Sequence, residues 1–335
     1  MAEKKFLITG GAGFVGSHLT DRLLEAGHSV VVLDNLSTGQ LSNLDKAGRN
    51  PNFRFVQGSV LDEQIVDELV HECDTVLHLA AAVGVQLVVD EPLRSLTTNI
   101  RGSENVIGAA HRYRRTVLIT STSEIYGKNS AGPLREDADR ILGSTTVSRW
   151  AYSTAKAVDE ILAYAYHRER GLPAIVVRLF NTVGPRQSPA YGMVIPRLVR
   201  QALRNEPITV FGDGQQTRCF AHVRDVVTAL TDLLDDPRAI GETFNIGHAE
   251  EISMIDLARE IKRLTDSEST IELIPYEEAY GDGFEDMRRR VPDTTKIREL
   301  TGWRPTQSLA AILSDTIAEA QVEMHQEEAL GESVR

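Results

Sequence analysis

A tyrosine and a lysine stand four residues apart in the segment YSTAK, at Tyr152 and Lys156. On a helix, side chains at positions i and i+4 share a face, so the ammonium group can approach the phenol. A nearby cation lowers the pKa of a phenol from about 10 toward neutral pH. The resulting tyrosinate could take a proton from a hydroxyl group while hydride leaves the same carbon. This spacing is common on surface helices, so the assignment depends on neighbouring motifs.

A second reactive segment, Ser121–Gly127 (STSEIYG), follows the apolar run Thr116–Thr120. It places Thr122, Ser123 and Glu124 in a row at the end of an expected buried strand. Hydroxyl groups at that position could donate hydrogen bonds to a developing oxyanion, and the carboxylate could orient a water. The alternative for Glu124 is a structural carboxylate that caps a nearby helix or pairs with an arginine.

A glycine-rich turn lies between an expected strand and an expected helix, with the spacing Gly10-x-x-Gly13-x-x-Gly16. Glycines there allow a tight turn and close approach of the backbone to a pyrophosphate, which then faces the helix N-terminus. Asp34 ends the second expected strand, 18 residues after Gly16. A carboxylate at that position accepts hydrogen bonds from an adenosine ribose and repels a 2′-phosphate. The sequence therefore predicts NAD rather than NADP, with a solvated turn residue as the alternative for Asp34.

These residues need a scaffold, and the first half of the chain alternates strand-like apolar runs with helical patterns. We expect strands in Lys5–Gly10, His28–Asp34, Asn52–Gly58, Asp74–Ala80, Thr116–Thr120 and Pro173–Phe180, and helices over about 13–26, 63–72, 95–112 and 153–171. This order, with β-branched strands buried on both faces, predicts an α/β fold. The expected architecture is a Rossmann-like doubly wound parallel sheet with helices on both faces.

After Asn181 the pattern changes, because loops with Pro and Gly separate short helices. We expect residues 1–180 to form an NAD-binding Rossmann domain with a later return segment near 215–247. Residues 181–318 should form mainly a smaller mixed α/β lobe that binds the substrate. Residues 319–335 are polar and acidic, and we expect a C-terminal tail that frays after a final helix.

Composition narrows the possible partners. The chain has 335 residues and a formal net charge of −12, which disfavours binding to nucleic acid or to anionic membranes. Its two cysteines, Cys73 and Cys219, lack metal-ligand spacing and indicate reduced thiols. Neither a signal-peptide pattern nor an apolar run of about 18 residues is present in the sequence, so we expect a cytoplasmic protein.

Taken together, these motifs resemble the extended short-chain dehydrogenases that act on nucleotide sugars. The resemblance is carried, in the family's order, by TGGAGFVGSHL, HLAA, STSEIYG, YSTAK, RLFNTVGPR and LTGWRP, from about Phe6 to Pro305. It implies tightly held NAD, a nucleotide-sugar-binding lobe and a homodimer built from two helices of each subunit. It also implies that Thr122, Tyr152 and Lys156 are the catalytic triad. An NAD-sensing regulator on the same fold is the non-enzymatic alternative, but it predicts a broken triad.

Within this family, the reaction depends on the residues after Thr122. The 4,6-dehydratases carry Thr-Asp-Glu there, and Ser123 is too weak an acid to expel water. Plain 4-epimerases tend to have small, non-acidic residues at the position of Glu124. Thr-Ser-Glu resembles the UDP-glucuronate decarboxylases, as do SRWAYSTAK, TRCFAHVRD and YGDGFEDMRRRVPD. The resemblance implies oxidation at C4, loss of CO₂ and formation of UDP-xylose or a UDP-4-keto-pentose, with a 4-epimerase of UDP-glucuronate or UDP-glucose as the alternative.

The same resemblance supplies the expected binding residues. Asn181, Arg218 and Arg290 should hold the diphosphate or the sugar, and Arg186 should border the base together with the segment MVIP. Arg290 is also expected to act in catalysis. Ser59 stands where many relatives have an aspartate, which weakens the expected adenine contact. The expected NAD contacts are Gly10, Gly13, Phe14, Val15, Gly16, Asp34, Asn35, Ser59, Val60, Leu79, Ala80, Ala81, Asn99, Tyr152 and Lys156.

Overall fold

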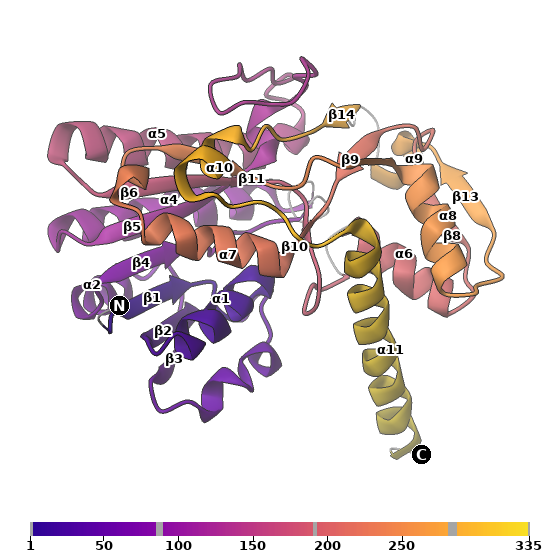
Figure 1. The fold of residues 1–335 in the computed structure, drawn as a ribbon, viewed down its shortest axis with the longest axis horizontal. Helices are drawn as coiled ribbons and strands as arrows, with labels where there is room; N and C mark the ends of the chain where they lie inside the picture. The colour runs from indigo at the N-terminus through magenta and orange to yellow at the C-terminus, as the bar shows by residue number, and fades with distance from the viewer. Residues whose placement is uncertain (1–2, 85–89, 190–192, 281–286, 334–335) are drawn as a thin grey trace.

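The structure is a computed structural model that describes residues 3–84, 90–189, 193–280 and 287–333. A seven-stranded sheet forms its larger lobe, with the strand order β11-β6-β5-β4-β1-β2-β3 (Figure 1). All neighbouring strands pair in parallel. The strands are β1 (Lys5–Thr9), β2 (Ser29–Asp34), β3 (Phe53–Gln57), β4 (Thr75–His78), β5 (Thr116–Thr122), β6 (Ala174–Leu179) and β11 (Thr243–Ile246). The predicted doubly wound α/β fold is confirmed.

Helices cover both faces of the sheet. One face carries α1 (Phe14–Glu25), α7 (Val223–Leu234) and α10 (Thr295–Thr301), and the other carries α2 (Glu63–Glu72), α4 (Pro92–Arg112) and α5 (Ala151–Arg170). Because α7 and β11 follow residue 181, the chain returns to the larger lobe after it has entered the smaller one (Figure 1). Short 3₁₀ helices among the described residues include η1 (Leu41–Leu44), η2 (Ala47–Arg49) and η6 (Pro237–Ala239).

The smaller lobe combines helices with short strands. Its helices are α6 (Val194–Leu203), α8 (Met254–Leu264), α9 (Tyr276–Tyr280) and α11 (Leu309–Ser333). β8 (Ile208–Phe211) pairs in parallel with β13 (Ile271–Ile274), and β7 (Thr182–Val183) pairs with β10 (Ala221–His222). β9 (Thr217–Cys219) lies between β12 (Glu251–Ser253) and β14 (Arg289–Arg290). This lobe has its own apolar core, to which Ile195, Leu198, Phe220 and Leu257 belong.

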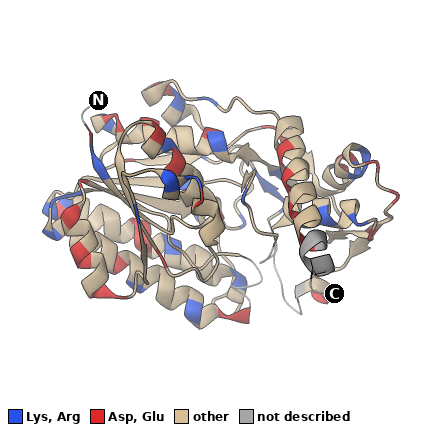
Figure 2. Cartoon of the chain, turned by 90° about the horizontal axis from the view of Figure 1, so that it is seen from below, with Lys and Arg blue, Asp and Glu red and all other residues tan. Residues whose placement is uncertain are grey.

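The C-terminal segment differs from the prediction. Residues 319–333, expected to fray as a tail, continue the helix α11, which extends away from the rest of the molecule (Figure 1). The segment is rich in Glu and also contains Ala and Gln, which favour helices. Ion pairs from Arg200 to Glu323 and Glu327 also fix α11 against α6. Acidic side chains are distributed along α11 toward its C-terminal end (Figure 2). Among the described helices, none has the length and apolar character to cross a membrane.

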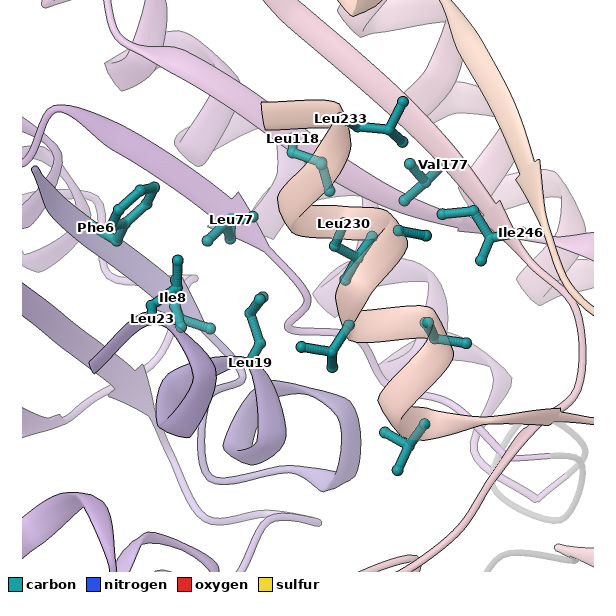
Figure 3. Close-up of a cluster of buried hydrophobic side chains, with 14 of the residues drawn as sticks. Phe6, Ile8, Leu19, Leu23, Leu77, Leu118, Val177, Leu230, Leu233 and Ile246 are labelled. Carbon is teal, nitrogen blue, oxygen red and sulfur yellow. The ribbon is translucent and has the colours of Figure 1, made fainter. Parts of the chain in front are cut away.

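Side chains along each strand alternate between the two faces of the sheet, and each face has its own apolar core. In β1, Phe6 and Ile8 belong to the core on the face that α1 and α7 cover (Figure 3). Leu7, between them, belongs to the core on the opposite face. All three side chains are at most 3% exposed. Such double burial explains why the strands read as continuous apolar runs. It also fixes the carboxyl ends of β1, β2, β4 and β5 at one edge, where the polar residues of the site follow.

Candidate active site

Two adjoining cavities open at the carboxyl ends of the central strands. The smaller has a volume of about 250 Å³ and is lined by the glycine-rich turn and the end of β2. The larger, of about 400 Å³, lies between the end of β5 and the smaller lobe. Val15, Leu79 and Ala81 line both cavities, so the two spaces meet. Ligands of doubly wound sheets bind at this edge.

Close backbone packing requires glycine in the first turn. Gly10 has φ +75°, which L-residues with a side chain rarely adopt. A Cβ atom at Gly16 would lie 2.3 Å from the carbonyl oxygen of Gly10. Gly13 is the N-cap of α1 and offers no side-chain acceptor to the first-turn N–H groups. A helix N-terminus of this kind attracts an anion, so the turn fits a pyrophosphate.

Asp34 connects the end of β2 to this turn. Its carboxylate accepts hydrogen bonds from the backbone N–H of Ala12 at 3.0 Å and of Leu36 at 2.8 Å. Burial raises the pKa of the Asp34 carboxyl, and these two N–H groups oppose that shift. Asp34 is not a solvated turn residue, because it is 8% exposed and lines the smaller cavity.

Most of the residues expected to contact NAD line the smaller cavity, but Ser59, Asn99, Tyr152 and Lys156 do not. Ser59 accepts a hydrogen bond from the Leu61 N–H at 3.2 Å and lies outside the cavity lining. Asn99 is fully buried, and its Oδ1 accepts a hydrogen bond from the Ala82 N–H at 2.8 Å. Asn99 therefore supports the segment after β4 from behind. The residues found in the lining are Gly10, Gly13, Phe14, Val15, Gly16, Asp34, Asn35, Val60, Leu79, Ala80 and Ala81.

The end of β5 delivers three side chains to the larger cavity. Thr122 caps the short helix η3 (Ser123–Tyr126), and its Oγ1 accepts a hydrogen bond from the Glu124 N–H at 3.2 Å. The hydroxyl proton of Thr122 is not used in that bond. Ser123 is 2% exposed and lines the same cavity, as do Glu124 and Tyr152. The segment predicted to be reactive is therefore assembled in one space.

Glu124 lies between two arginines. Arg149, in η4 (Ser148–Trp150), donates to both carboxylate oxygens, with its Nη2 2.7 Å from Oε1. Arg290 donates to Oε1 at 3.3 Å. Burial would raise the pKa of Glu124, but the two guanidinium groups lower it from 4.5 to about 2. The arginine pairing considered as the structural alternative for Glu124 is present, and it occurs inside the cavity.

Arg290 also connects the two lobes. Its Nη2 donates to Oδ1 of Asn181 at 2.5 Å, and β14 pairs in parallel with β9 so that Arg290 stands beside Arg218. Asn181, Arg218 and Arg290 all line the larger cavity. The smaller lobe thus brings the guanidinium groups of Arg218 and Arg290 to the larger cavity, and that of Arg290 reaches Glu124, a geometry suited to an anionic sugar nucleotide.

The placement of Arg186 differs from the expected one at the larger cavity. Arg186 lines the smaller cavity rather than the larger one and pairs with Asp21 at 2.8 Å. Part of the segment YGDGFEDMRRRVPD, residues 281–286, lies outside the described residues.

The expected contact between Tyr152 and Lys156 also differs. Tyr152 is 8% exposed and lines the larger cavity, but the ammonium group of Lys156 donates to Asp159 at 3.1 Å. Burial raises the pKa of Tyr152, and the anions Glu124 and Asp159 add to that effect. The predicted lowering of the Tyr152 pKa by Lys156 is wrong for this arrangement. The physical reason is that Asp159, one helical turn away, accepts a hydrogen bond from the ammonium group.

The sequence analysis missed Arg149. The residue lies in SRWAYSTAK, three positions before Tyr152, and it is 5% exposed. A buried carboxylate at the end of β5 requires a cation, and this arginine immediately before the reactive helix could have been that signal. The distance of 25 residues between Arg149 and Glu124 in the chain hid the pair.

Comparisons with known proteins agree with this geometry. A family model described as GDP-mannose 4,6 dehydratase matches residues 7–316. The chain is 40% identical over 316 residues to a UDP-N-acetyl-alpha-D-glucosaminuronate decarboxylase of Bacillus cytotoxicus, covering 94% of this chain and 97% of that protein. It is 37% identical to UDP-glucuronic acid decarboxylase 1 of Danio rerio, covering 94% of this chain and 72% of that protein. A solved structure of UDP-glucuronic acid 4-epimerase from Bacillus cereus, with UDP-glucuronic acid and NAD, superposes with a TM-score of 0.86 at 29% identity, covering 95% and 99%.

Proposed function

The chain belongs to the GDP-mannose 4,6 dehydratase family, and we propose that it is an NAD-dependent decarboxylase of UDP-glucuronate that works through a 4-keto sugar. The observation that carries this proposal is the placement of Thr122, Ser123 and Glu124 in one cavity with Arg149 and Arg290. The two decarboxylases reported above, at 37–40% identity, support the same reaction class. The product is UDP-xylose, a UDP-4-keto-pentose or both.

The cofactor fits the smaller cavity, where the glycine-rich turn offers a site for its pyrophosphate and Asp34 a carboxylate for its ribose. Bound NAD supplies the hydride acceptor for oxidation at C4 of the sugar. Tyr152 takes the proton of the C4 hydroxyl in that step. Thr122 donates a hydrogen bond to the C4 oxygen and later stabilises negative charge there.

The charged groups act on the acid part of the sugar. Oxidation at C4 turns the C6 carboxylate into a β-keto acid, whose loss of CO₂ leaves an enolate on the C4 oxygen. Arg290 binds the charged sugar, and Glu124 with Arg149 keeps that guanidinium in position. Ser123 stands where a dehydratase needs an acid, so water is not expelled.

The alternative function is 4-epimerisation of UDP-glucuronate or UDP-glucose, which the structural similarity to the Bacillus cereus epimerase favours. To separate the two, the purified protein is incubated with NAD and UDP-glucuronate, and the nucleotide sugar is analysed by mass spectrometry. We expect a product lighter by the mass of CO₂. A product of unchanged mass would support the epimerase instead. A parallel incubation with UDP-N-acetylglucosaminuronate tests the substrate of the Bacillus cytotoxicus relative.

We predict that Asp34→Asn lowers the preference for NAD over NADP about 10-fold, because the charge that repels a 2′-phosphate is lost. Asparagine has one acceptor oxygen and keeps the hydrogen bond from either Ala12 or Leu36, since these two N–H groups bond different carboxylate oxygens of Asp34. The measurement is kcat/KM with each dinucleotide. Asp45→Asn, an exposed carboxylate beyond η1, is the control and should leave the ratio unchanged. An unchanged ratio in Asp34→Asn would remove Asp34 from cofactor selection.

We also propose that the protein is a homodimer formed by α4 and α5, which lie side by side on one face of the sheet (Figure 1). Leu93 on α4 and Ile161 on α5 are 76% and 63% exposed, which is unusual for large apolar side chains. Ile161→Glu should weaken dimerisation about 100-fold, since it places a charge in both halves of the contact. Analytical ultracentrifugation measures this, with Val322→Glu on α11 as the control. Equal dimer stability in both variants would exclude this interface.

The two lobes receive separate roles in this proposal. Residues 1–180 with the return segment near 215–247 bind NAD, and residues 181–318 bind mainly the UDP sugar. The larger cavity supports this division, because Leu198, Phe211 and Met254 of the smaller lobe line it. Cys73 and Cys219 are free and buried, which fits the reducing cytoplasm.

A further inference from the structure

The helix that carries Tyr152 also holds a sealed ion pair. The Nζ of Lys156 lies 3.1 Å from Oδ2 of Asp159, and both side chains are 1% exposed. The described residues that line the two cavities do not include either partner. Asp159, three residues after Lys156 on α5, therefore holds the ammonium group from behind the reactive face of the helix.

Burial raises the pKa of the Asp159 carboxyl, and among the described residues Lys156 and a hydrogen bond from Ser103 oppose that shift. Its Oδ1 is buried and has no hydrogen-bond partner among the described residues. Beyond it, Ser103 of α4 is hydrogen-bonded to Nε2 of His78 at 3.0 Å, and Nδ1 of His78 is paired with the Thr9 hydroxyl at 2.8 Å. Burial and the charge of Lys156 lower the pKa of His78 to about 3, so the imidazole is neutral.

A buried carboxylate with one unsatisfied oxygen is unfavourable unless it compensates another charge. Glu160, the next residue, is also buried, but both of its oxygens are bonded to Arg178, and its role is structural. Asp159 instead faces the one lysine that the YSTAK motif places near Tyr152. Its position indicates that its function concerns that lysine.

We propose that Asp159 is a positioning residue of the reaction, which anchors Lys156 and balances its charge and thereby sets the electrostatic potential at the Tyr152 hydroxyl. This inference rests on the proposed role of Tyr152 as the base. It assigns a function to a residue that contacts neither cavity.

The charged groups around Tyr152 determine the direction of the expected effect. Glu124 faces it from η3, with Arg149 of η4 and Arg290 of β14 bonded to that carboxylate. Lys156 and Asp159 belong to its own helix. Burial raises the pKa of Tyr152, and Glu124 and Asp159 raise it further. Removing the charge of Asp159 while Lys156 keeps its own should lower that pKa.

The test uses Asp159→Asn and measures the pH dependence of C4 oxidation in a single turnover with NAD and UDP-glucuronate, followed by the absorbance of the reduced nicotinamide. Oxidation by a tyrosinate base rises with pH, and we expect this rise to move to lower pH by about one unit. Glu160→Gln is the matched control, since it removes a neighbouring buried charge and should not move the rise. An unmoved rise in folded Asp159→Asn would overturn the proposal.

A second measurement does not depend on activity. Ultraviolet titration of the protein alone, compared with the same protein carrying Tyr152→Phe, isolates the ionisation of Tyr152. We expect it to occur at lower pH in Asp159→Asn, and an unchanged titration would contradict the inference. If Asp159→Asn is recovered unfolded, Asp159→Ser leaves room for a water beside Lys156 and carries the same prediction. If the wild-type protein oxidised no uronate, the proposed function would be wrong, but the titration would still test the effect of Asp159 on Tyr152.

Discussion

Replacing Tyr152 with phenylalanine is expected to slow oxidation at C4 about 1,000-fold, because the variant has no group to take the hydroxyl proton. The phenol lines the cavity beside Thr122 and Glu124 and is 8% exposed. Phenylalanine keeps the ring and its packing, so the fold should persist. Without the ketone at C4 the carboxylate is not activated, and CO₂ release should fall by the same factor.

The measurement is the burst of reduced nicotinamide after mixing with UDP-glucuronate, together with the release of CO₂. Tyr164→Phe is a matched control on the same helix, since its hydroxyl bonds Thr243 outside both cavities. It should react at close to the wild-type rate. A Tyr152→Phe protein that still reduces its cofactor at the wild-type rate would show that another group is the base.

Local patterns were sufficient to predict the elements that form the cofactor site. The helix over residues 63–72 agrees with α2, and the alternation of buried strands gave the parallel sheet. The glycine turn and Asp34 were predictable because each acts within one β-α-β unit, where spacing along the chain fixes distance in space. The contact of Asp34 with Ala12 follows from the pairing of adjacent strands β1 and β2.

Contacts between distant segments could not be predicted in this way. The pair of Glu124 with Arg149 depends on the path of the chain between η3 and η4, and Arg290 reaches the site only because β14 joins β9 in parallel. Lys156 presents a different problem. Its spacing suits Tyr152 at i−4 and Asp159 at i+3 equally well, and in the structure the ammonium group donates to Asp159. The sequence pattern did not point to Asp159, because the spacing to Tyr152 already accounted for the position of Lys156.

The variant Glu124→Gln is expected to slow CO₂ release about 100-fold while C4 oxidation changes much less. The carboxylate lies between Arg149 and Arg290, and its loss raises the positive potential in the cavity. That potential stabilises the sugar carboxylate in the ground state, whereas the charge must leave this group as CO₂ departs. Reduced cofactor and the 4-keto acid should therefore accumulate. Rapid quenching followed by mass spectrometry detects both.

The pH dependence of CO₂ release shows whether Glu124 acts as a permanently ionised carboxylate or as a base that takes up a proton. The pKa of Glu124, about 2, keeps the carboxylate ionised at neutral pH, so we expect CO₂ release from the wild-type protein to show no step from Glu124 between about pH 5 and 8. Because this pKa is lower than the ordinary 4.5, the ion pair stabilises the fold above pH 4.5, and that contribution is lost as the pH falls toward 2.

Removing one partner of a buried pair is destabilising, by about 3–5 kcal/mol, so Glu124→Gln needs a charge-matched companion. The double variant Arg149→Met with Glu124→Gln removes both charges of the pair and should unfold at a higher temperature than Glu124→Gln alone. Its CO₂ release should remain slow, since Arg290 has still lost the carboxylate that orients it. If the double variant regains wild-type CO₂ release, Glu124 serves only to neutralise Arg149, and decarboxylation depends on other groups.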